Sequence, residues 1–181
     1  MKNSFYTMRP EPYKIGLYSL IEYINKIKPT YEMNMLEIGT YLGESTIIFS
    51  QKFKNVITID PYIDNYDAND PTCNYISLNE VYKKFLEKTS EIKTITLIKK
   101  TSDDAIHELK DKKFDFIYID GMHTYDQVKK DIKNYKPLVK EGGFIGGHDY
   151  HPNWQGVINA INEEINNVDF IFEDTSWIKK I

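Results

Sequence analysis

Two apolar segments of the chain each end in carboxylate and imidazole side chains. The first ends in Asp120, with His123 three residues later, and the second ends in His148 and Asp149. Apolar segments of this kind form the strands of parallel sheets, whose carboxyl ends meet at the crevice where ligands bind. Carboxylates and histidines gathered there can hold a divalent metal ion or move protons. The pattern therefore predicts a metal-assisted or acid–base site at one edge of a sheet.

A turn with two glycines precedes these segments in the chain. Gly39 and Gly43 flank a predicted strand-to-helix turn, where a missing side chain lets the backbone approach a ligand or pack against another segment. The helix after the turn offers free N–H groups and the positive end of its dipole. The Gly-x-x-x-Gly spacing does not match the dinucleotide fingerprint, which disfavours a nicotinamide dehydrogenase.

Polar residues also follow the next two predicted strands. Asp60 comes about 21 residues after Gly39, where an acidic side chain in nucleoside-binding sheets hydrogen-bonds ribose hydroxyls. The alternative is a helix or turn cap before Pro61. Ser102 and Asp103 follow the third strand, and they either cap a helix or contact the edge of an adenine ring.

A regular alternation of apolar patterns predicts the elements that position these residues. A leading helix is predicted within residues 1–30, where apolar side chains recur at three- and four-residue steps. Strands are predicted at 33–38, 56–60, 94–98, 114–120 and 143–148, and helices at 45–52, 78–88, 103–109, 125–134 and 156–166. The last two strands, 168–172 and 176–181, are too close for a crossover helix and must pair antiparallel. The sequence therefore predicts a doubly wound, Rossmann-like α/β fold whose seven-stranded sheet is mostly parallel with a C-terminal antiparallel hairpin.

A long loop is predicted over residues 61–77, which are rich in Asp and Asn and contain Tyr62 and Tyr66. A loop of this length in a compact domain is usually functional or disordered. We expect a lid on the substrate side of the site rather than a merely solvated loop.

Composition limits the classes of protein to consider. The 181 residues, 41% of them hydrophobic, fit a single domain over residues 1–181. The net charge of -4, with lysines spread among acidic residues, argues against a nucleic-acid partner. The lone Cys73 cannot form an internal disulfide. No apolar run approaches the roughly 20 residues of a membrane span, so a cytoplasmic protein without a membrane partner is expected.

Taken together, the motifs resemble those of the class I S-adenosylmethionine-dependent methyltransferases. The resemblance rests on the Glu-Ile-Gly-Thr-Tyr-Leu-Gly-Glu-Ser turn at 37–45, Asp60, the Asp-Gly-Met-His-Thr-Tyr run at 120–125, Gly142-Gly143 and His148-Asp149. The pattern is similar to that of a small-molecule O-methyltransferase subgroup that includes macrocin O-methyltransferases and cephalosporin hydroxylase-like proteins. The resemblance implies that the cofactor contacts Glu37, Gly39, Thr40, Tyr41, Gly43, Ser45, Asp60, Ser102, Asp103 and Asp120.

The resemblance also implies roles for the residues at the strand ends. By likeness to metal-dependent relatives, Asp120, His148 and Asp149 would bind a divalent metal, and Asp120 and His123 would be the catalytic residues, with His123 as general base. Magnesium prefers oxygen ligands, whereas an imidazole ligand favours softer metals such as manganese. A bound cation would ease loss of the proton from an acceptor hydroxyl. Asp131, on the following helix, is expected to be a structural partner rather than a catalyst.

The sequence thus predicts an S-adenosylmethionine-dependent O-methyltransferase, assisted by a divalent metal (Mg or Mn), that acts on a hydroxyl of a sugar or phenolic small molecule. Two alternatives stay open. One is a metal-dependent, hydroxylase-like enzyme of the same fold, and the other is a non-catalytic module that binds a nucleoside-containing metabolite. The short N-terminal region leaves little material to enclose an acceptor, so a homo-oligomer is a further expectation.

Overall fold

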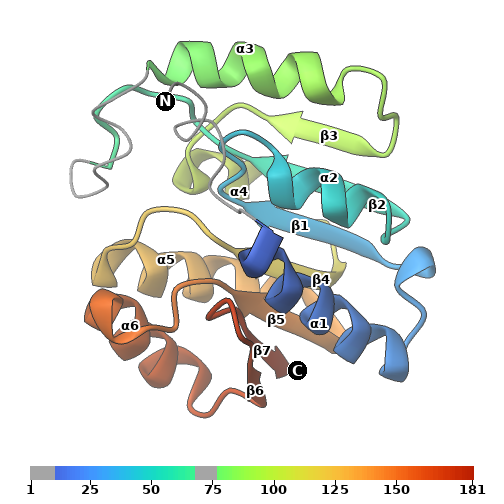
Figure 1. Cartoon of the computed structure of the whole chain (residues 1–181). Helices are drawn as coiled ribbons and strands as arrows, with labels where there is room; N and C mark the ends of the chain where they lie inside the picture. Colours follow the sequence, from blue (N-terminus) through green and yellow to red (C-terminus); the bar gives the residue numbers. More distant parts are fainter. Residues whose placement is uncertain (1–10, 68–76) are drawn as a thin grey trace.

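A seven-stranded sheet of order β3-β2-β1-β4-β5-β7-β6 forms the centre of the computed structural model, which describes residues 11–67 and 77–181 (Figure 1). The strands are β1 (Asn34–Ile38), β2 (Asn55–Ile59), β3 (Ile95–Ile98), β4 (Phe114–Ile119), β5 (Val139–Gly147), β6 (Phe170–Ile171) and β7 (Trp177–Lys180). Strands β1 to β5 are parallel, whereas β7 pairs antiparallel with both β5 and β6. The predicted fold class, including the C-terminal hairpin, is confirmed.

The helices of the described residues alternate with these strands. They are α1 (Glu11–Ile27), α2 (Glu44–Ser50), α3 (Leu78–Thr89), α4 (Ser102–Leu109), α5 (Tyr125–Tyr135) and α6 (Gln155–Ile165), with short 3-10 helices η2 (Thr30–Glu32), η4 (Lys136–Leu138) and η5 (Pro152–Trp154). The side chains of Ser77, Thr101 and Thr124 cap α3, α4 and α5, each by accepting a backbone N–H two or three residues later. The predicted leading helix is present as α1.

Both faces of the sheet are covered, because successive side chains of each strand point to opposite sides. Met35 and Phe116 pack with apolar side chains of α1 and α2 in one buried cluster. Leu36 and Ile117 pack on the other face with side chains of α4, α5 and α6. A third cluster, around Phe85, joins α3 to the turn after β1. The helices therefore enclose the sheet, and the carboxyl ends of its parallel strands all lie at one edge.

Two strands differ from the predicted ones by more than one residue at one end. Strand β5 begins at Val139 rather than at residue 143. It continues through an irregularity, where Gly142 adopts a positive φ of 71° and the register with β4 shifts between Phe114 and Phe116. Strand β6 is limited to Phe170–Ile171. Residues 68–76 of the predicted lid lie outside the described part of the chain.

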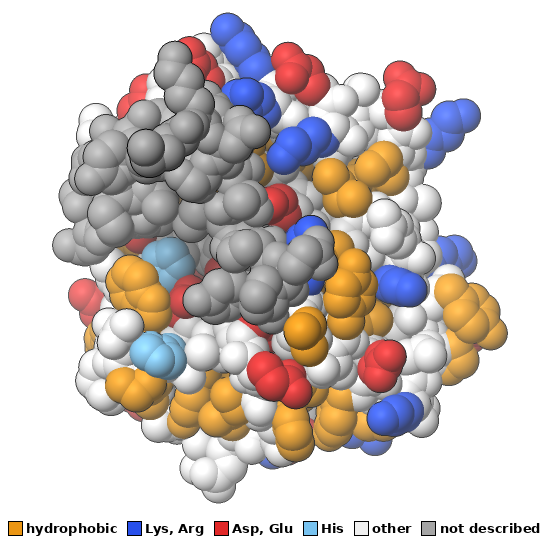
Figure 2. All heavy atoms as spheres, viewed as in Figure 1, with side chains coloured by type: hydrophobic (Ala, Val, Ile, Leu, Met, Phe, Trp, Pro, Cys, Tyr) orange, Lys and Arg blue, Asp and Glu red, His pale blue; other side chains and the backbone are white. Residues whose placement is uncertain are grey.

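Two further expectations from composition concern the surface charge and membrane-spanning helices. On the face shown in Figure 2, lysine side chains lie among acidic ones rather than in one basic area. Among the helices of the described residues, none has both the length and the apolar character needed to cross a bilayer.

Candidate active site

A cavity of about 440 Å³ lies at the carboxyl ends of the parallel strands. This volume falls within the range of small-molecule sites. Many predicted site residues line it: Gly39, Thr40, Tyr41, Ser45, Asp60, Ser102, Asp120, His123, His148 and Asp149. The predicted residues Glu37, Gly43 and Asp103 are not part of its wall. The loops after five neighbouring strands therefore share one site, as the strand-end pattern predicts.

Asp60 fixes the backbone of the turn after β1. Its Oδ2 accepts the backbone N–H groups of Thr40 at 3.1 Å and Tyr41 at 2.9 Å, and its Oδ1 accepts that of Tyr62 at 2.9 Å. Burial raises the pKa of Asp60, and these three N–H groups act in the opposite direction. A carboxylate has about four lone-pair sites, so one site remains, on Oδ1. Asp60 therefore caps the turn and can still accept a hydrogen bond from a ligand in the cavity.

The two glycines of this turn are required by close packing within the protein. Gly39 has a φ of 87°, and a Cβ there would lie 1.9 Å from the carbonyl oxygen of Asp120. Gly43 has a φ of 77°, and a Cβ there would meet the ring of Phe85 at 2.8 Å. Of the two interpretations left open by the sequence, the structure shows packing against protein at both positions. The Gly39 contact also joins the turn directly to the loop after β4.

Glu37 lies beneath the turn as the centre of a buried hydroxyl network. Its carboxylate accepts hydrogen bonds from Ser45 Oγ at 2.5 Å, Thr46 Oγ1 at 2.5 Å and Thr58 Oγ1 at 2.9 Å. The side chain is fully buried. Burial raises the pKa of Glu37 from 4.5 to about 7, against the opposing effect of the three hydroxyls. Glu37 therefore holds β1, β2 and the start of α2 together rather than lining the cavity.

This raised pKa predicts a pH-dependent stability. The folded protein binds the Glu37 proton more tightly than the unfolded chain, so this stabilisation is complete below pH 4.5 and is lost as the pH rises through about 7. The loss amounts to about 3 kcal/mol. The variant Glu37→Gln cannot ionise and should gain stability by this amount, relative to wild type, between pH 4.5 and 8.

Urea unfolding across this pH range measures the effect. The exposed Glu87 on α3 offers a matched control, Glu87→Gln, whose stability should follow that of wild type at every pH. A constant difference between Glu37→Gln and wild type over the whole range would show that Glu37 does not bind a proton preferentially in the folded state.

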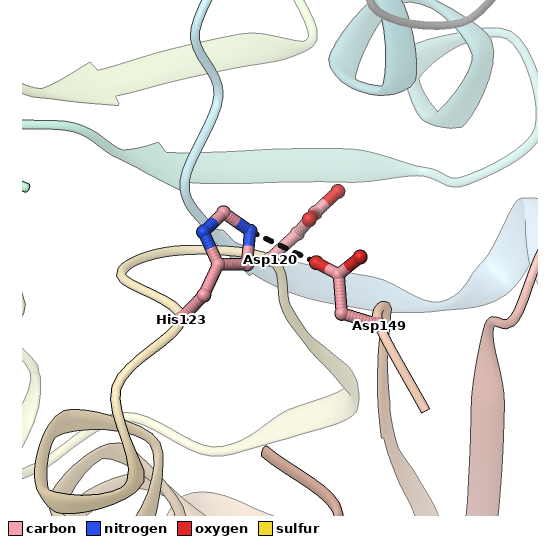
Figure 3. A group of neighbouring side chains, drawn as sticks. All are labelled: Asp120, His123 and Asp149. Carbon is pink, nitrogen blue, oxygen red and sulfur yellow. Dashed lines mark ion pairs between the residues drawn. The ribbon is translucent and has the colours of Figure 1, made fainter. Parts of the chain in front are cut away.

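His123 and Asp149 form the centre of the acid–base cluster (Figure 3). His123 Nε2 lies 2.9 Å from Asp149 Oδ2, and Asp120 lies behind this pair on the loop after β4. The imidazole ring stacks on Trp154 with a centroid distance of 4.5 Å. Asp149 has a φ of 63°, a left-handed conformation that is uncommon for a side-chain-bearing residue and often found at functional sites.

A second carboxylate, which was not predicted as a site residue, also contacts His123. Asp67 Oδ2 accepts the backbone N–H of His123 at 3.3 Å and lies 3.6 Å from its Nδ1. Burial lowers the pKa of His123, but the neighbouring carboxylates of Asp149 and Asp67 outweigh it and raise the pKa to about 10. In this arrangement His123 is an imidazolium at neutral pH. Asp67 lies in the predicted lid, whose acidic composition was the only sequence signal for it.

Two imidazoles, those of His123 and His148, lie beside the two strand-end carboxylates. Asp120, His123 and Asp149 each offer one ligand atom, and all three atoms lie within 4.8 Å of one another. His148, the predicted ligand, also lies close, with its Nδ1 at 3.1 Å from Asp149 Oδ1 and 3.8 Å from Asp120 Oδ1. Burial disfavours the charged form of Asp149, but His123 and His148 hold the pKa of Asp149 well below its usual range. The donor set of two carboxylates and an imidazole fits a divalent cation.

The far part of the cavity wall is formed by α4 and α5. Ser102 lies at the start of α4, and Gln127 and Asp131 reach the cavity from α5. Asp131 is a hydrogen-bond partner, as expected, but it also lines the cavity, which the sequence analysis missed. Asp103 instead pairs with Lys130 at 2.7 Å and is absent from the cavity wall. Its predicted cofactor contact is therefore not supported by its position.

The strand order, with an antiparallel β7 between β5 and β6 and a cavity at the carboxyl edge, defines the class I methyltransferase architecture. Residues 36–150 match the sequence family described as "Methyltransferase domain". The chain belongs to this family, and the predicted resemblance to S-adenosylmethionine-dependent methyltransferases is confirmed.

Two curated relatives are themselves uncharacterized proteins. Protein R132 of Acanthamoeba polyphaga mimivirus is 32% identical over 140 residues, which cover 73% of this chain and 59% of R132. Protein y4gI of Sinorhizobium fredii is 25% identical over 118 residues, which cover 64% of this chain but only 13% of y4gI. The chain therefore spans less than two thirds of the length of either relative.

Solved structures share the fold at low sequence identity. An O-methyltransferase of Bacillus cereus in complex with SAH is 16% identical with a TM-score of 0.61, covering 96% of this chain and 81% of that one. The N-methyltransferase NodS of Bradyrhizobium japonicum is 14% identical with a TM-score of 0.62, covering 96% and 97%. CalS11, a TDP-rhamnose 3'-O-methyltransferase of calicheamicin biosynthesis, is 12% identical with a TM-score of 0.63, covering 95% and 81%.

Proposed function

We propose that the protein transfers the methyl group of S-adenosylmethionine to a hydroxyl of a sugar or phenolic small molecule, with assistance from a divalent cation. The observation that carries the proposal is that one cavity connects Asp60 to the cluster of Asp120, His123 and Asp149. A nucleoside bound at Asp60 and an acceptor bound at the cluster would meet inside this cavity. A sulfonium methyl is already activated for transfer, so the protein must mainly align the two molecules and manage one proton.

The side chains of the cluster are suited to removing the proton of the acceptor hydroxyl. His123 Nε2 lies 2.9 Å from Asp149 Oδ2, and stacking on Trp154 holds the ring in place. A cation bound by Asp120, Asp149 and His148 would lower the proton affinity of the acceptor hydroxyl. The cation would also weaken the interaction of Asp149 with the His123 proton, because the cation and this proton would compete for the same carboxylate. His123 would then be free to accept a proton as a general base.

The choice of acceptor draws support from a similar structure. CalS11 is a TDP-rhamnose 3'-O-methyltransferase, and its fold matches over 95% of this chain. NodS, of the same fold, is an N-methyltransferase, so amines belong among the tested acceptors. The aromatic side chain of Trp154, in the cavity wall beside the cluster, can stack on the flat face of a sugar or a phenol.

An acceptor screen tests the proposal. Purified protein is incubated with S-adenosylmethionine and nucleotide sugars, phenols or amines, and S-adenosylhomocysteine is quantified as the product. We expect turnover with a hydroxyl acceptor. Transfer to amines alone would contradict the O-methyltransferase assignment, and an absence of S-adenosylhomocysteine binding in calorimetry would contradict the cofactor.

The cation is tested separately on the same reaction. Treatment with a chelator should abolish turnover, and magnesium or manganese should restore it. Asp149→Asn should lose binding of manganese measured by calorimetry, whereas Asp104→Asn, on the outer part of α4, should retain it. Full turnover in the presence of chelator would remove the cation from the proposed mechanism.

A further inference from the structure

A buried carboxylate in the cavity wall has no cationic partner among the described residues. Asp131 is 1% exposed, and its Oδ1 accepts a hydrogen bond from Gln127 Nε2 at 3.0 Å. Lys130, the preceding residue, pairs with Asp103 instead. Burial raises the pKa of Asp131 to about 6, although hydrogen bonds from Ser102 and Gln127 oppose this rise. At neutral pH the cavity therefore contains a largely ionised acid that lacks a counter-ion, and a buried carboxylate of this kind is costly unless donors satisfy it.

The hydrogen-bond partners of Asp131 fix its orientation without using all its acceptor capacity. Gln127 Nε2 donates one hydrogen to Asp131 and the other to Ser102 Oγ at 3.1 Å. Both amide hydrogens of Gln127 are thus used within the protein. A carboxylate has about four lone-pair sites. The two protein donors leave Asp131 able to accept further hydrogen bonds from a molecule in the cavity, whose wall it forms.

The position of Asp131 in the site follows from the strand order. Along the carboxyl edge of the sheet, Ser102 follows β3, Asp60 follows β2, and Asp120 follows β4 on the other side of β1. Asp131 is joined to the Ser102 part of this row through Gln127. If the reacting methyl lies at the Asp120 cluster and the ribose at Asp60, the base extends away from the cluster. It then reaches Ser102 and Asp131.

We propose that Asp131 recognises the exocyclic amino group of adenine in the cofactor, an inference that rests on the proposed function. The amino group is a hydrogen-bond donor and matches the carboxylate acceptor. Hypoxanthine has a carbonyl oxygen in the same place, and this oxygen would face the carboxylate without a hydrogen between them. The site therefore selects an amino-substituted purine.

Asp103 is the competing candidate for this role. Its Oδ2 binds Lys130, but its Oδ1 is buried and has no hydrogen-bond partner within the described residues. Asp103 is absent from the cavity wall, whereas Asp131 is part of it. A test must therefore include both carboxylates.

Calorimetry with two ligands separates the candidates. The dissociation constants of S-adenosylhomocysteine and of its hypoxanthine analogue, S-inosylhomocysteine, are measured for wild type, Asp131→Asn and Asp103→Asn. Wild type should bind the hypoxanthine analogue about 100-fold more weakly. In Asp131→Asn the two constants should come within about fivefold of each other, because a carboxamide can donate to the hypoxanthine oxygen. Asp103→Asn should keep the wild-type ratio.

Each other outcome overturns the inference. Similar affinities of wild type for the two ligands, equal weakening of both in Asp131→Asn, or loss of selectivity in Asp103→Asn would each show that Asp131 does not recognise the base. Thermal melting establishes that the variants are folded, and Asp131→Ser replaces Asp131→Asn if the latter is not. No binding of S-adenosylhomocysteine to wild type would instead overturn the proposed function, and the inference with it.

Discussion

Replacing His123 with glutamine will lower kcat by about 1,000-fold while the affinity for S-adenosylhomocysteine stays within about threefold. Glutamine is polar and of similar length, but it cannot take up or release a proton near neutral pH. The imidazole of His123 is held between Asp149 and Asp67 and stacked on Trp154, which suits its proposed role as the proton carrier. Initial rates with the acceptor from the screen measure kcat, and calorimetry measures the affinity.

His151 provides the matched control for this variant. It is exposed and lies outside the cavity wall, where its Nδ1 accepts the backbone N–H of Asn153 at 3.2 Å. His151→Gln should keep kcat within about twofold of wild type. If His123→Gln turned over at the wild-type rate, another group would have to carry the proton.

Replacing Asp60 with asparagine will weaken the binding of S-adenosylhomocysteine by about 100-fold. The two carboxylate oxygens accept three backbone N–H groups from the turn after β1 and from Tyr62. Asparagine has a single acceptor oxygen, and its NH2 group would face at least one of these donors. The turn would lose its shape, and the acceptor for a ribose hydroxyl would be lost with it. Calorimetric titration measures the change.

Asp64 lies four residues further along the same segment and offers the same substitution away from the cavity. Its Oδ1 accepts the backbone N–H of Leu78 at 2.6 Å and caps the start of α3. Asp64→Asn should bind S-adenosylhomocysteine within about threefold of wild type. Wild-type affinity in Asp60→Asn would mean that the cofactor does not use this end of the cavity.

The sheet and its functional edge could be predicted because they depend on short-range patterns. Apolar runs that end in Asp60, Asp120 or Asp149 indicate buried parallel strands, and parallel strands bring their carboxyl ends together whatever their order. The gap of only a few residues before β7 likewise leaves no room for a crossover helix. These inferences need no knowledge of how the helices pack.

The residue positions that the sequence could not predict depend on long-range packing. Asp103 and Asp131 are both acidic residues of helices, and only the rotation of α4 and α5 against each other decides that Asp131 reaches the cavity. Likewise, the left-handed backbone of Asp149 directs its carboxylate toward His123 as well as His148. An aspartate in this conformation carries no sequence signal as clear as that of a glycine. The contact of Asp67 with His123 joins residues 56 positions apart and has no local signature.

Because of the contact between Gly39 and the Asp120 carbonyl, the spacing within the site and the side chains of the cavity wall can be varied independently. Main-chain atoms, rather than exchangeable side chains, form this contact between the turn after β1 and the loop that carries Asp120. The side chain of Tyr66 also lines the cavity but belongs to the segment after β2, outside this contact. Libraries that vary Tyr66 should therefore change how ligands fit the cavity while this spacing is retained.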